Sequence, residues 1–479
     1  VPDTAFVNDI RADLHDPDTV YVALDNHKYG DYKPYLLKST NKGRSWKSMT
    51  ANLEDRHLVW RIVQDHVDPD LFFIATEFGI FFTINNGEKW VELTGGSPTI
   101  SYRDVIIQRR ENDLVAGSFG RGIFILDDYT PLRNLNEKDL DKEALLFGGR
   151  KAWWYVERHP LGFSEGASQG NNLFRAPNPD FGANFTYYLK EGLKTTREER
   201  KDREKPSIKD GKNTPFPGFD TVEEERRETP PEVWLTVKDN NGNVMRRIKG
   251  DTKKGFHRIA WDLRTPSLSA VRNNGEADGS GFLVVPGEYN VTLSKRVRGI
   301  TTVLAGPETF EVTPLRSGAL KGAEPAETVA FWDRLSKLQR GVSAANTALG
   351  NLDKRLKGLK SALENSRSTP DTLDNEWQEI RTEVYEIEEL LSGNHTQNSS
   401  FGAVKDTIQS RLGKAMIGTG LSTYGPTKTH LEIISYAETD FTDVRSRINT
   451  LMKTTLPAFE AKLIEAGAPW APGGEIPAL

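Results

Sequence analysis

Apolar residues recur along the first part of the chain as short strand-like runs, and the pattern repeats at a period of roughly 45 residues. The clearest runs are Val20–Leu24, Leu71–Ala75 and Leu114–Ala116, each of which follows a polar turn. Four-stranded propeller blades produce a repeat of this length, because each blade is one supersecondary unit that packs on its neighbours. The pattern therefore predicts that residues 1–129 form terminal β-propeller blades.

Two of the three repeats also share a turn pattern, Ser/Thr-x-Asn-x-Gly-x-x-Trp. Its members are Ser39, Asn41, Gly43 and Trp46 in one copy and Thr83, Asn85, Gly87 and Trp90 in the other. Asparagine side chains bond nearby backbone in turns, and glycine adopts a positive φ without steric cost. The two tryptophans are expected to fill gaps between neighbouring sheets. The pattern resembles the Asp-box of sialidase-like and sortilin-like propellers, with Asn in place of the usual Asp.

Three repeats are too few for a closed ring, since propellers close with about 4–8 blades around a central channel. An open array leaves strands without partners, and such edges invite association. We expect the remaining propeller blades to lie on a separate or cleaved chain, or upstream of Val1 in a larger protein. The chain is then predicted to act within a homo-oligomer or a larger extracellular assembly.

Residues 181–315 contain short runs that alternate apolar and polar side chains, as half-solvated antiparallel strands do. Strands of this length and spacing predict an immunoglobulin-like sandwich, with Trp261 in its core. Residues 190–230 interrupt this domain with charges of alternating sign, which is typical of a solvated insertion that contains some helix. Residues 130–180 are predicted to connect the blades to the sandwich.

The hydrophobic period changes to steps of three and four between residues 325 and 466. One uninterrupted row of this kind comprises Leu335, Leu338, Val342, Ala345, Leu349, Leu352, Leu356, Leu359 and Leu363. Antiparallel packing within one chain would bury such rows, which predicts a C-terminal helical bundle over residues 325–466. An intermolecular coiled coil is the alternative. Residues 467–479 are predicted to form a C-terminal tail.

The composition narrows the classes of partner. Of the 479 residues, 37% are hydrophobic and the formal net charge is -5. No apolar run approaches the roughly 20 residues of a membrane span, and no unopposed basic stripe indicates nucleic-acid binding. The absence of cysteine excludes disulfides, thiol catalysis and zinc–thiolate sites. Ten tryptophans without cysteine suit a secreted or periplasmic bacterial protein, or one at the cell surface.

Three further motifs carry a resemblance to a known family. They are Gly-Arg-Gly-Ile-x-x-Leu-Asp-Asp at residues 120–128, Asn-Pro-x-x-Gly-Ala at residues 178–183, and His-Arg-x-x-Trp-Asp-Leu-Arg at residues 257–264. Their order resembles the C-terminal half of large bacterial sortilin-like proteins, also described as BNR-repeat (Asp-box) glycosyl hydrolase-like proteins. The resemblance implies terminal propeller blades, an Ig-like domain of the flagellar hook-capping type and a helical tail. It indicates the fold better than the function.

Candidate site residues follow the second strand of each repeat. Asp25 and His27, Glu77 and Arg121 occupy these places and are expected to face the central channel. Together they could bind a polar ligand or perform acid–base chemistry. The alternative is structural, because charged residues in a channel can pair with one another, as Glu77 and Arg121 could. No catalytic residue is assigned.

Metal-binding motifs are absent from the sequence: neither a His-Glu-x-x-His pattern nor an EF-hand loop occurs. The Asp-Pro-Asp turns at residues 16–18 and 68–70 could hold Ca²⁺. Such turns also form without a metal, since Asp bonds its own backbone and Pro presets φ. No other cofactor is expected.

The sequence favours a non-enzymatic protein- or glycan-binding or assembly protein of the bacterial cell exterior. The first alternative is a polysaccharide-acting glycoside hydrolase whose paired carboxylates lie mostly in further blades. The second is a structural subunit of a surface assembly, held together through the helices and the open blades.

Overall fold

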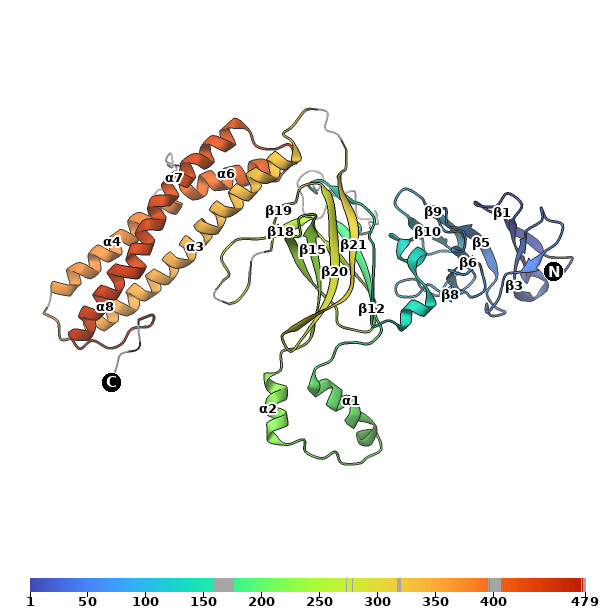
Figure 1. Ribbon diagram of the computed structural model, residues 1–479, viewed down its shortest axis with the longest axis horizontal. Coiled ribbons are helices and arrows are strands. Elements are labelled where there is room, and N and C mark those ends of the chain that lie inside the picture. Colours follow the sequence, from blue (N-terminus) through green and yellow to red (C-terminus); the bar gives the residue numbers. More distant parts are fainter. Residues whose placement is uncertain are drawn as a thin grey trace. The chain divides into compact units, whose positions relative to one another are not determined.

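The computed structural model describes residues 1–157, 176–316 (except 273 and 278), 320–394 (except 370), 396, 406–474 and 476 (Figure 1). Parts of the predicted connecting segment and of the predicted C-terminal tail lie outside these residues. The chain divides into two compact units. One comprises Val1–Ala152, Phe174–Trp261 and Glu288–Glu311, and the other comprises Trp153–Leu173, Asp262–Gly287 and Val312–Leu479. The fold is multidomain, β-rich with a helical C-terminal part, as predicted.

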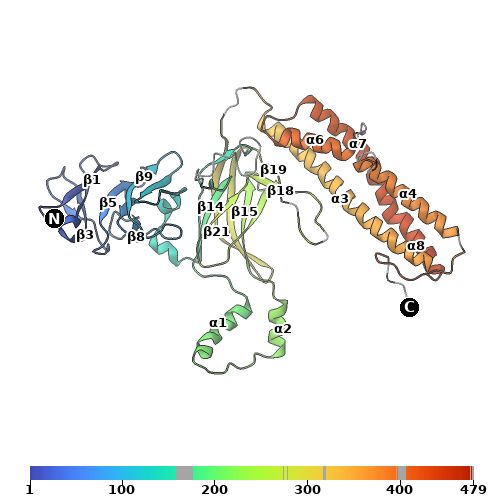
Figure 2. The same ribbon diagram turned by 180° about the vertical axis from the view of Figure 1, so that it is seen from behind.

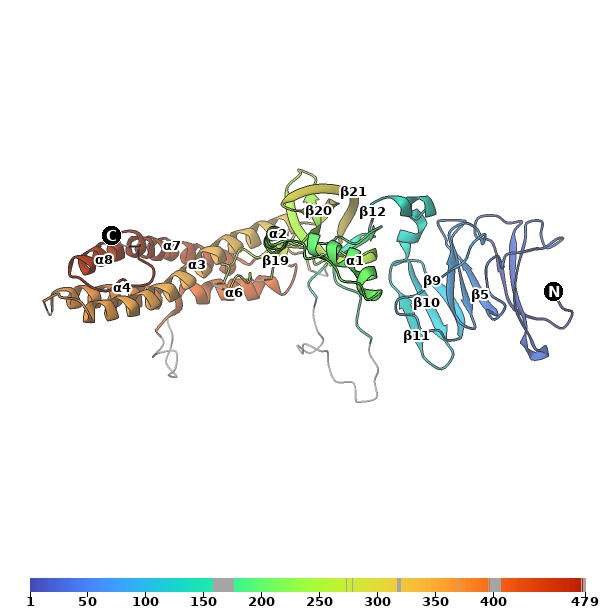
Figure 3. The same ribbon diagram turned by 90° about the horizontal axis from the view of Figure 1, so that it is seen from below.

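Three antiparallel sheets follow one another at the start of the chain, and Figure 3 shows them face to face. The first sheet contains β1 (Phe6–Ala12), β2 (Val20–Asn26), β3 (Asp31–Ser39) and β4 (Lys47–Ser48). The second contains β5 (Val59–Gln64), β6 (Phe72–Thr76), β7 (Gly79–Thr83) and β8 (Val91–Glu92). The third contains β9 (Tyr102–Gln108), β10 (Asp113–Ser118) and β11 (Ile123–Leu126). We call them the first, second and third blades.

Two apolar cores hold the blades together. The core between the first and second blades includes Tyr21, Leu36, Ile62, Phe72 and Trp90. The core between the second and third blades includes Phe73, Phe82, Tyr102, Leu114 and Tyr129. Because β6 runs through the middle of the array, its side chains are buried on both faces. Period-two alternation therefore disappears in this strand, as expected for a strand covered on both sides.

The two predicted turn boxes have the same hydrogen bonds. In the second blade, Thr83 Oγ1 donates to Asn85 Oδ1 (2.7 Å), which also accepts from Lys89 N–H (3.0 Å). Ser39 and Asn41 make the equivalent bonds in the first blade. In both blades the asparagine side chain thus bridges the turn without adding a charge.

The two box tryptophans differ in burial. Trp90 is 2% exposed and donates through Nε1 to Met49 O of the preceding blade (2.8 Å). Trp46 is 40% exposed, so the structure shows the expected gap-filling position for Trp90, and that of Trp46 stays a prediction. The reason is positional: a box tryptophan packs on the blade before its own, and no described sheet precedes the first blade.

The two box glycines provide a matched stability test. Gly43 and Gly87 both have φ near +80° (81° and 83°), but an added Cβ at Gly87 would collide with Met49, reaching its Cε at 2.7 Å. At Gly43 the nearest atom is Trp46 Cζ2 at 3.6 Å. We expect Gly43→Ala to cost about 1 kcal/mol and Gly87→Ala about 2–3 kcal/mol. Denaturant unfolding of both variants measures the difference, and equal losses would contradict the role given to Met49.

The sandwich consists of two sheets. One has the order β12 (Ala144–Phe147), β14 (Ala183–Leu189), β17 (Gly255–Trp261). The other has the order β13 (Ala152–Trp154), β21 (Ile300–Pro314), β20 (Gly287–Val297), β15 (Glu232–Asp239), β16 (Val244–Gly250). The 3-10 helices η2 (Thr130–Asn134) and η3 (Glu137–Asp141) precede β12. In β14 and β15 every second side chain is buried, as the alternation predicted.

Aromatic side chains fill the sandwich core. Trp261 is buried and meets Tyr289 edge-on, with ring centroids 5.5 Å apart. Phe310 contacts Trp261 and Phe185 from the opposite sheet, at 6.1 and 5.1 Å. Edge-to-face contacts at these distances are favourable beyond simple burial. The prediction that Trp261 is a core residue is confirmed.

The charged insertion contains two helices, α1 (Thr196–Lys209) and α2 (Phe219–Arg227). Arg200 of α1 pairs with both carboxylate oxygens of Glu225 in α2, at 2.7 and 2.8 Å. Opposite charges at helix spacing pair within each helix too, as in Arg226 with Glu223. The alternating signs therefore neutralise one another locally.

The second unit contains the helical bundle and a two-stranded sheet (Figure 2). Its elements are β18 (Arg264–Pro266), β19 (Ser280–Leu283), α3 (Pro325–Glu364), α4 (Thr372–Ser392), α6 (Ile408–Gly420), α7 (Lys428–Thr450), η5 (Leu451–Thr455) and α8 (Leu456–Glu465). Every member of the predicted leucine-rich row is buried along α3. The row therefore packs within one chain. No helix in the described part of the chain has the length and apolar character to cross a membrane.

Candidate binding site at one end of the blades

Turns between the second and third strands lie at one end of the three blades. These turns are His27–Tyr29, residues 77–78 and residues 119–122. The N–H of Glu77 donates to Leu58 O (3.0 Å), just before β5. In the same way, Phe119 N–H donates to Ser101 O (2.8 Å), just before β9. We call the first strand of each blade, which is β1, β5 or β9, its inner strand. The two bonds bring the turns of the second and third blades next to the start of the inner strand of the same blade.

Each inner strand has a β-bulge at the same position of the repeat. The pairing register skips one residue in β1, in β5 and in β9. The skipped residues are Asn8, Trp60 and Arg103. Since a bulge leaves its extra residue outside the regular ladder and re-aims its side chain, these three side chains are released toward the same end of the array as the turns.

Glu77 is the centre of the cluster at this end. Its carboxylate accepts a hydrogen bond from Trp60 Nε1 (3.0 Å) and another from Ser101 Oγ (2.9 Å). Arg103 forms an ion pair with the same oxygen at 3.4 Å and stacks over the Trp60 ring, 3.7 Å from its centroid. Charge pairing and cation–π stacking act on the same guanidinium, so Trp60, Glu77 and Arg103 fix one another in place.

Asp25 and His27 join the cluster from the first blade. Asp25 is buried and accepts hydrogen bonds from His27 Nδ1 and from the His27 backbone N–H (3.3 Å). The His27 ring meets Trp60 edge-on, with centroids 5.8 Å apart. Three of the four predicted site residues, Asp25, His27 and Glu77, are therefore brought together, and Trp60 links them.

Arg121 lies apart from the other three. It is exposed and, within the described residues, forms no ion pair, whereas Glu77 pairs with Arg103. The turn after β10 is longer than the turn after β6, so Phe119, and not Arg121, follows its strand as Glu77 does. The pairing of Glu77 with Arg121 that the structural alternative allowed is therefore not formed, and Arg103 takes that place.

Sequence reasoning missed Trp60, Arg103 and Phe119. A signal was present in part, because Asn8 and Trp60 precede the second strand of their repeats by the same 12 residues, whereas Arg103 precedes β10 by 10. Alignment of the inner strands would have placed Asn8 and Trp60 at the same end as Glu77.

The turns at this end of the blades carry exposed aromatic side chains. Phe119 is 72% exposed and lies 5.6 Å from the Arg103 guanidinium. Phe78 and Tyr29, from the turns of the other two blades, are also exposed. We call Tyr29, Phe78, Phe119 and the anchored Arg103 the loop-end site.

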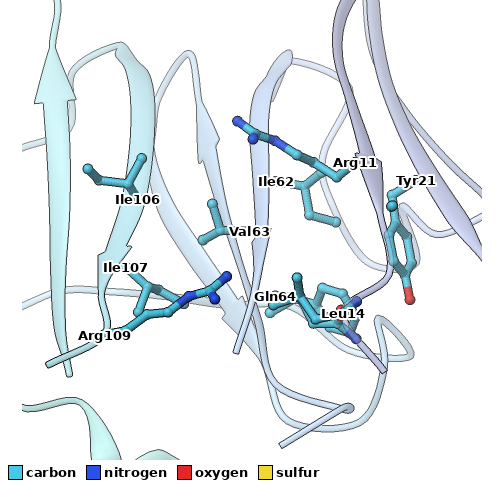
Figure 4. A pocket seen from close by; sticks show the side chains of 11 residues that line it. Arg11, Leu14, Tyr21, Ile62, Val63, Gln64, Ile106, Ile107 and Arg109 are labelled. Atoms are coloured by element: carbon cyan, nitrogen blue, oxygen red, sulfur yellow. The ribbon is translucent and has the colours of Figure 1, made fainter. Parts of the chain in front are cut away.

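A cavity lies on the inner strands, away from the loop-end site. It is a cavity of about 200 Å³ lined by all three inner strands, with Arg11, Gln64 and Arg109 around it (Figure 4). Gln64 is held by Asp13 (2.9 Å), which also accepts from Tyr21 Oη (2.5 Å). Burial and this hydrogen bond raise the pKa of Tyr21, so it remains a donor. Hydrogen bonds therefore fix Gln64 and Tyr21 on one side of the cavity, while most of the remaining lining is apolar.

The Asp-Pro-Asp turns are stabilised by their own hydrogen bonds. Asp16 accepts from Thr19 Oγ1 (2.7 Å) and from Asp18 N–H (3.0 Å), and Asp70 N–H donates to Asp68 (3.0 Å). Within the described residues, no group of three or more His, Asp or Glu side chains is arranged to hold a metal ion.

Comparison with known proteins gives distant likenesses. No family model matches the chain, and no curated protein matches it. Among solved structures, the extracellular domain of a hybrid two-component system from B. thetaiotaomicron is 10% identical, with a TM-score of 0.22, covering 64% of this chain and 32% of that chain. An ancestral GH74 enzyme is 15% identical, with a TM-score of 0.20, covering 63% and 32%.

The GH74 xyloglucanase from Xanthomonas campestris is 11% identical, with a TM-score of 0.21, covering 63% of this chain and 38% of that chain. The match thus spans about a third of the length of these proteins. Structural neighbours of this chain are therefore extracellular domains of Bacteroides proteins and GH74 enzymes, at a similarity too low to say what this chain binds.

Proposed function

We propose that this chain is a glycan-binding part of a larger propeller protein at the exterior of a bacterial cell, and that it has no catalytic role of its own. One observation carries the proposal: the exposed Phe119 lies beside Arg103, which Glu77 and Trp60 hold in a fixed position. An aromatic face next to a few fixed polar groups is the usual composition of a small-molecule or sugar site.

The chemistry of the loop-end site fits a hydroxyl-rich ligand. The guanidinium of Arg103 can donate to sugar hydroxyls while Glu77 neutralises its charge, which favours a polar ligand over a strongly anionic one. Phe119, Phe78 and Tyr29 offer apolar faces on which the C–H side of a sugar ring can pack. Because the three aromatics come from three blades, the site would follow an extended chain of sugars.

The arrangement of carboxylates supports binding over hydrolysis. A glycosidase needs two carboxyl groups that flank the scissile bond. Asp25 is buried behind His27, and Glu77 already accepts bonds from Trp60 and Ser101. Both acids are thus engaged in positioning neighbouring side chains.

Phe119→Ala tests the proposal. We expect the wild-type chain to be retained by at least one polysaccharide in affinity electrophoresis or sedimentation with cellulose, chitin, xylan, mannan, polygalacturonate and peptidoglycan. The variant should bind that polysaccharide roughly tenfold more weakly, because an aromatic contact at the centre of a site is worth more than 1 kcal/mol.

Phe219→Ala is the matched control, since Phe219 is also a strongly exposed phenylalanine but lies on α2. Its binding should equal that of the wild type. No retention by any of the six polysaccharides, or equal binding by the Phe119 variant, would overturn the proposal.

A further inference from the structure

The blades contact one another through equivalent rows of side chains. In the second blade Ile62, Ile74 and Phe81 lie opposite one another across three strands and are buried against the first blade. In the third blade, the equivalent row contains Val105 and Ala116, which are buried against the second blade. One face of each blade is thus built to receive the blade before it.

The first blade has the same row, on the face away from the second blade. Ile10, Val22 and Leu37 pair across β1, β2 and β3 in the same register, two residues after the same bulge, and Val22 is the one buried member of the row. Ile10 is 62% exposed, whereas its equivalent Ile62 is 1% exposed. The row keeps the apolar character of a blade–blade contact, although no described residue covers Ile10.

The third blade has the opposite face free. In the second blade, this face contains Phe73 and Phe82, which are buried against the third blade. The equivalent row of the third blade is Ile106, Val115 and Ile125. Ile106 and Ile125 are 51% and 59% exposed, although the row is entirely apolar. Exposed apolar patches of this kind mark interaction sites.

The box tryptophans are a second, separate indication that one face of the first blade is uncovered. Trp90 docks on the first blade, where Asn52 accepts its backbone N–H (2.7 Å) and donates to its carbonyl (2.9 Å). Trp46 is the equivalent residue of the first blade and is largely uncovered. It is the kind of aromatic anchor that supplies most of the energy of an interface.

A row of charges indicates what fits these faces. Asp9, Arg61 and Asp104 hold the same position in the three inner strands, and Arg61 bonds both acids at 3.1 Å. The side chain of Asp104 is 54% exposed, so a cation from a neighbouring blade could pair with it as Arg61 does. A second copy of this chain would place its own Asp9 there, and two adjacent carboxylates repel each other.

We propose that the free faces of the first and third blades bind further propeller blades from outside residues 1–479. The further blade that packs on the third blade has Arg or Lys opposite Asp104. The further blade that packs on the first blade contacts Trp46 and Ile10. Closure by a second copy of this chain is disfavoured by the charges. This inference rests on the part of the proposed function that places the chain in a larger propeller protein, and it does not depend on glycan binding.

Photo-cross-linking in the organism that makes the chain tests the inference. The photoreactive amino acid p-benzoylphenylalanine replaces Ile10 in one variant and Ile123, on the free face of the third blade, in another. Control variants place it at Val303 and Ile300 of β21, which have the same exposures of 62% and 71% as the two test positions. Mass spectrometry identifies the cross-linked peptides.

We expect peptides from blade-type repeats at both test positions and none at the controls. The blade captured at position 123 should have Arg or Lys directly after its inner-strand bulge. Cross-links between two isotopically distinct copies of this chain, peptides from proteins without blade repeats, or yields equal to those of the controls would overturn the inference. An acidic or uncharged residue opposite Asp104 would overturn its charge component.

Discussion

Replacing Trp261 by alanine is expected to lower the free energy of unfolding of the sandwich by about 3–5 kcal/mol. The indole is fully buried between the two sheets, and its removal leaves a cavity beside Tyr289 and Phe310. Amide hydrogen exchange of β17 and β20 measures the loss in this domain alone. This matters because a multidomain chain need not unfold in a single step.

Phe256→Ala is the matched control, because Phe256 lies on the same strand but is half exposed. We expect it to cost about 1 kcal/mol, in line with the smaller apolar area that it buries. Equal losses in the two variants would show that the inner face of β17 does not form the core.

Asp65→Ala should destabilise the blades by about 3–5 kcal/mol, because it leaves a buried arginine without its counter-ion. Asp65 accepts two hydrogen bonds from Arg133, at 3.0 and 2.8 Å, and one from Tyr129 Oη at 2.5 Å. Its side chain is completely buried. Exchange of the β6 amides would show the loss. Glu111→Ala, which removes a less buried acid near Arg150, should cost much less.

The same residue predicts a pH dependence. Burial raises the pKa of Asp65. Hydrogen bonds from Arg133, Tyr129 and two backbone N–H groups lower the pKa by more than burial raises it, so the pKa lies below its usual value. A carboxyl group with a lowered folded pKa contributes stability above its unfolded pKa and loses it as the pH falls through the folded pKa. In the wild type, the exchange protection of the β6 amides should therefore decrease as the pH falls through the folded pKa of Asp65. We expect this decrease to be smaller in Asp65→Ala. Identical acid profiles for wild type and variant would contradict this assignment.

The repeats and the helical rows were predictable because burial imposes a period on the sequence. The row along α3 and the strand β14 follow their periods without exception. Within the predicted bundle, the last helical stretch is interrupted, since η5 separates α7 from α8. A single turn with altered hydrogen bonding leaves the apolar spacing almost unchanged, so periodicity does not detect it.

The candidate site was predictable only in part, because the directions of some side chains depend on backbone irregularities that the sequence pattern does not reveal. Asp25, His27 and Glu77 were found because they lie at the end of strands that the repeat defines or directly after them. Arg103 was missed because its direction depends on a bulge, and a bulge is set by pairing with a distant strand. Glu77 and Arg121 were given equivalent places in their repeats because two turns of different length were treated as equal.

The shared bulge of the inner strands has a consequence for how such proteins diversify. Asn8, Trp60 and Arg103 are chemically unlike one another, yet each sits where its strand does not have to pair. Selection can exchange these side chains while the neighbouring apolar rows continue to hold the blades together. Each repeat thus has one inner-strand position whose side chain can be substituted without changing the contacts between blades, so the surface at this end can change while the fold is kept.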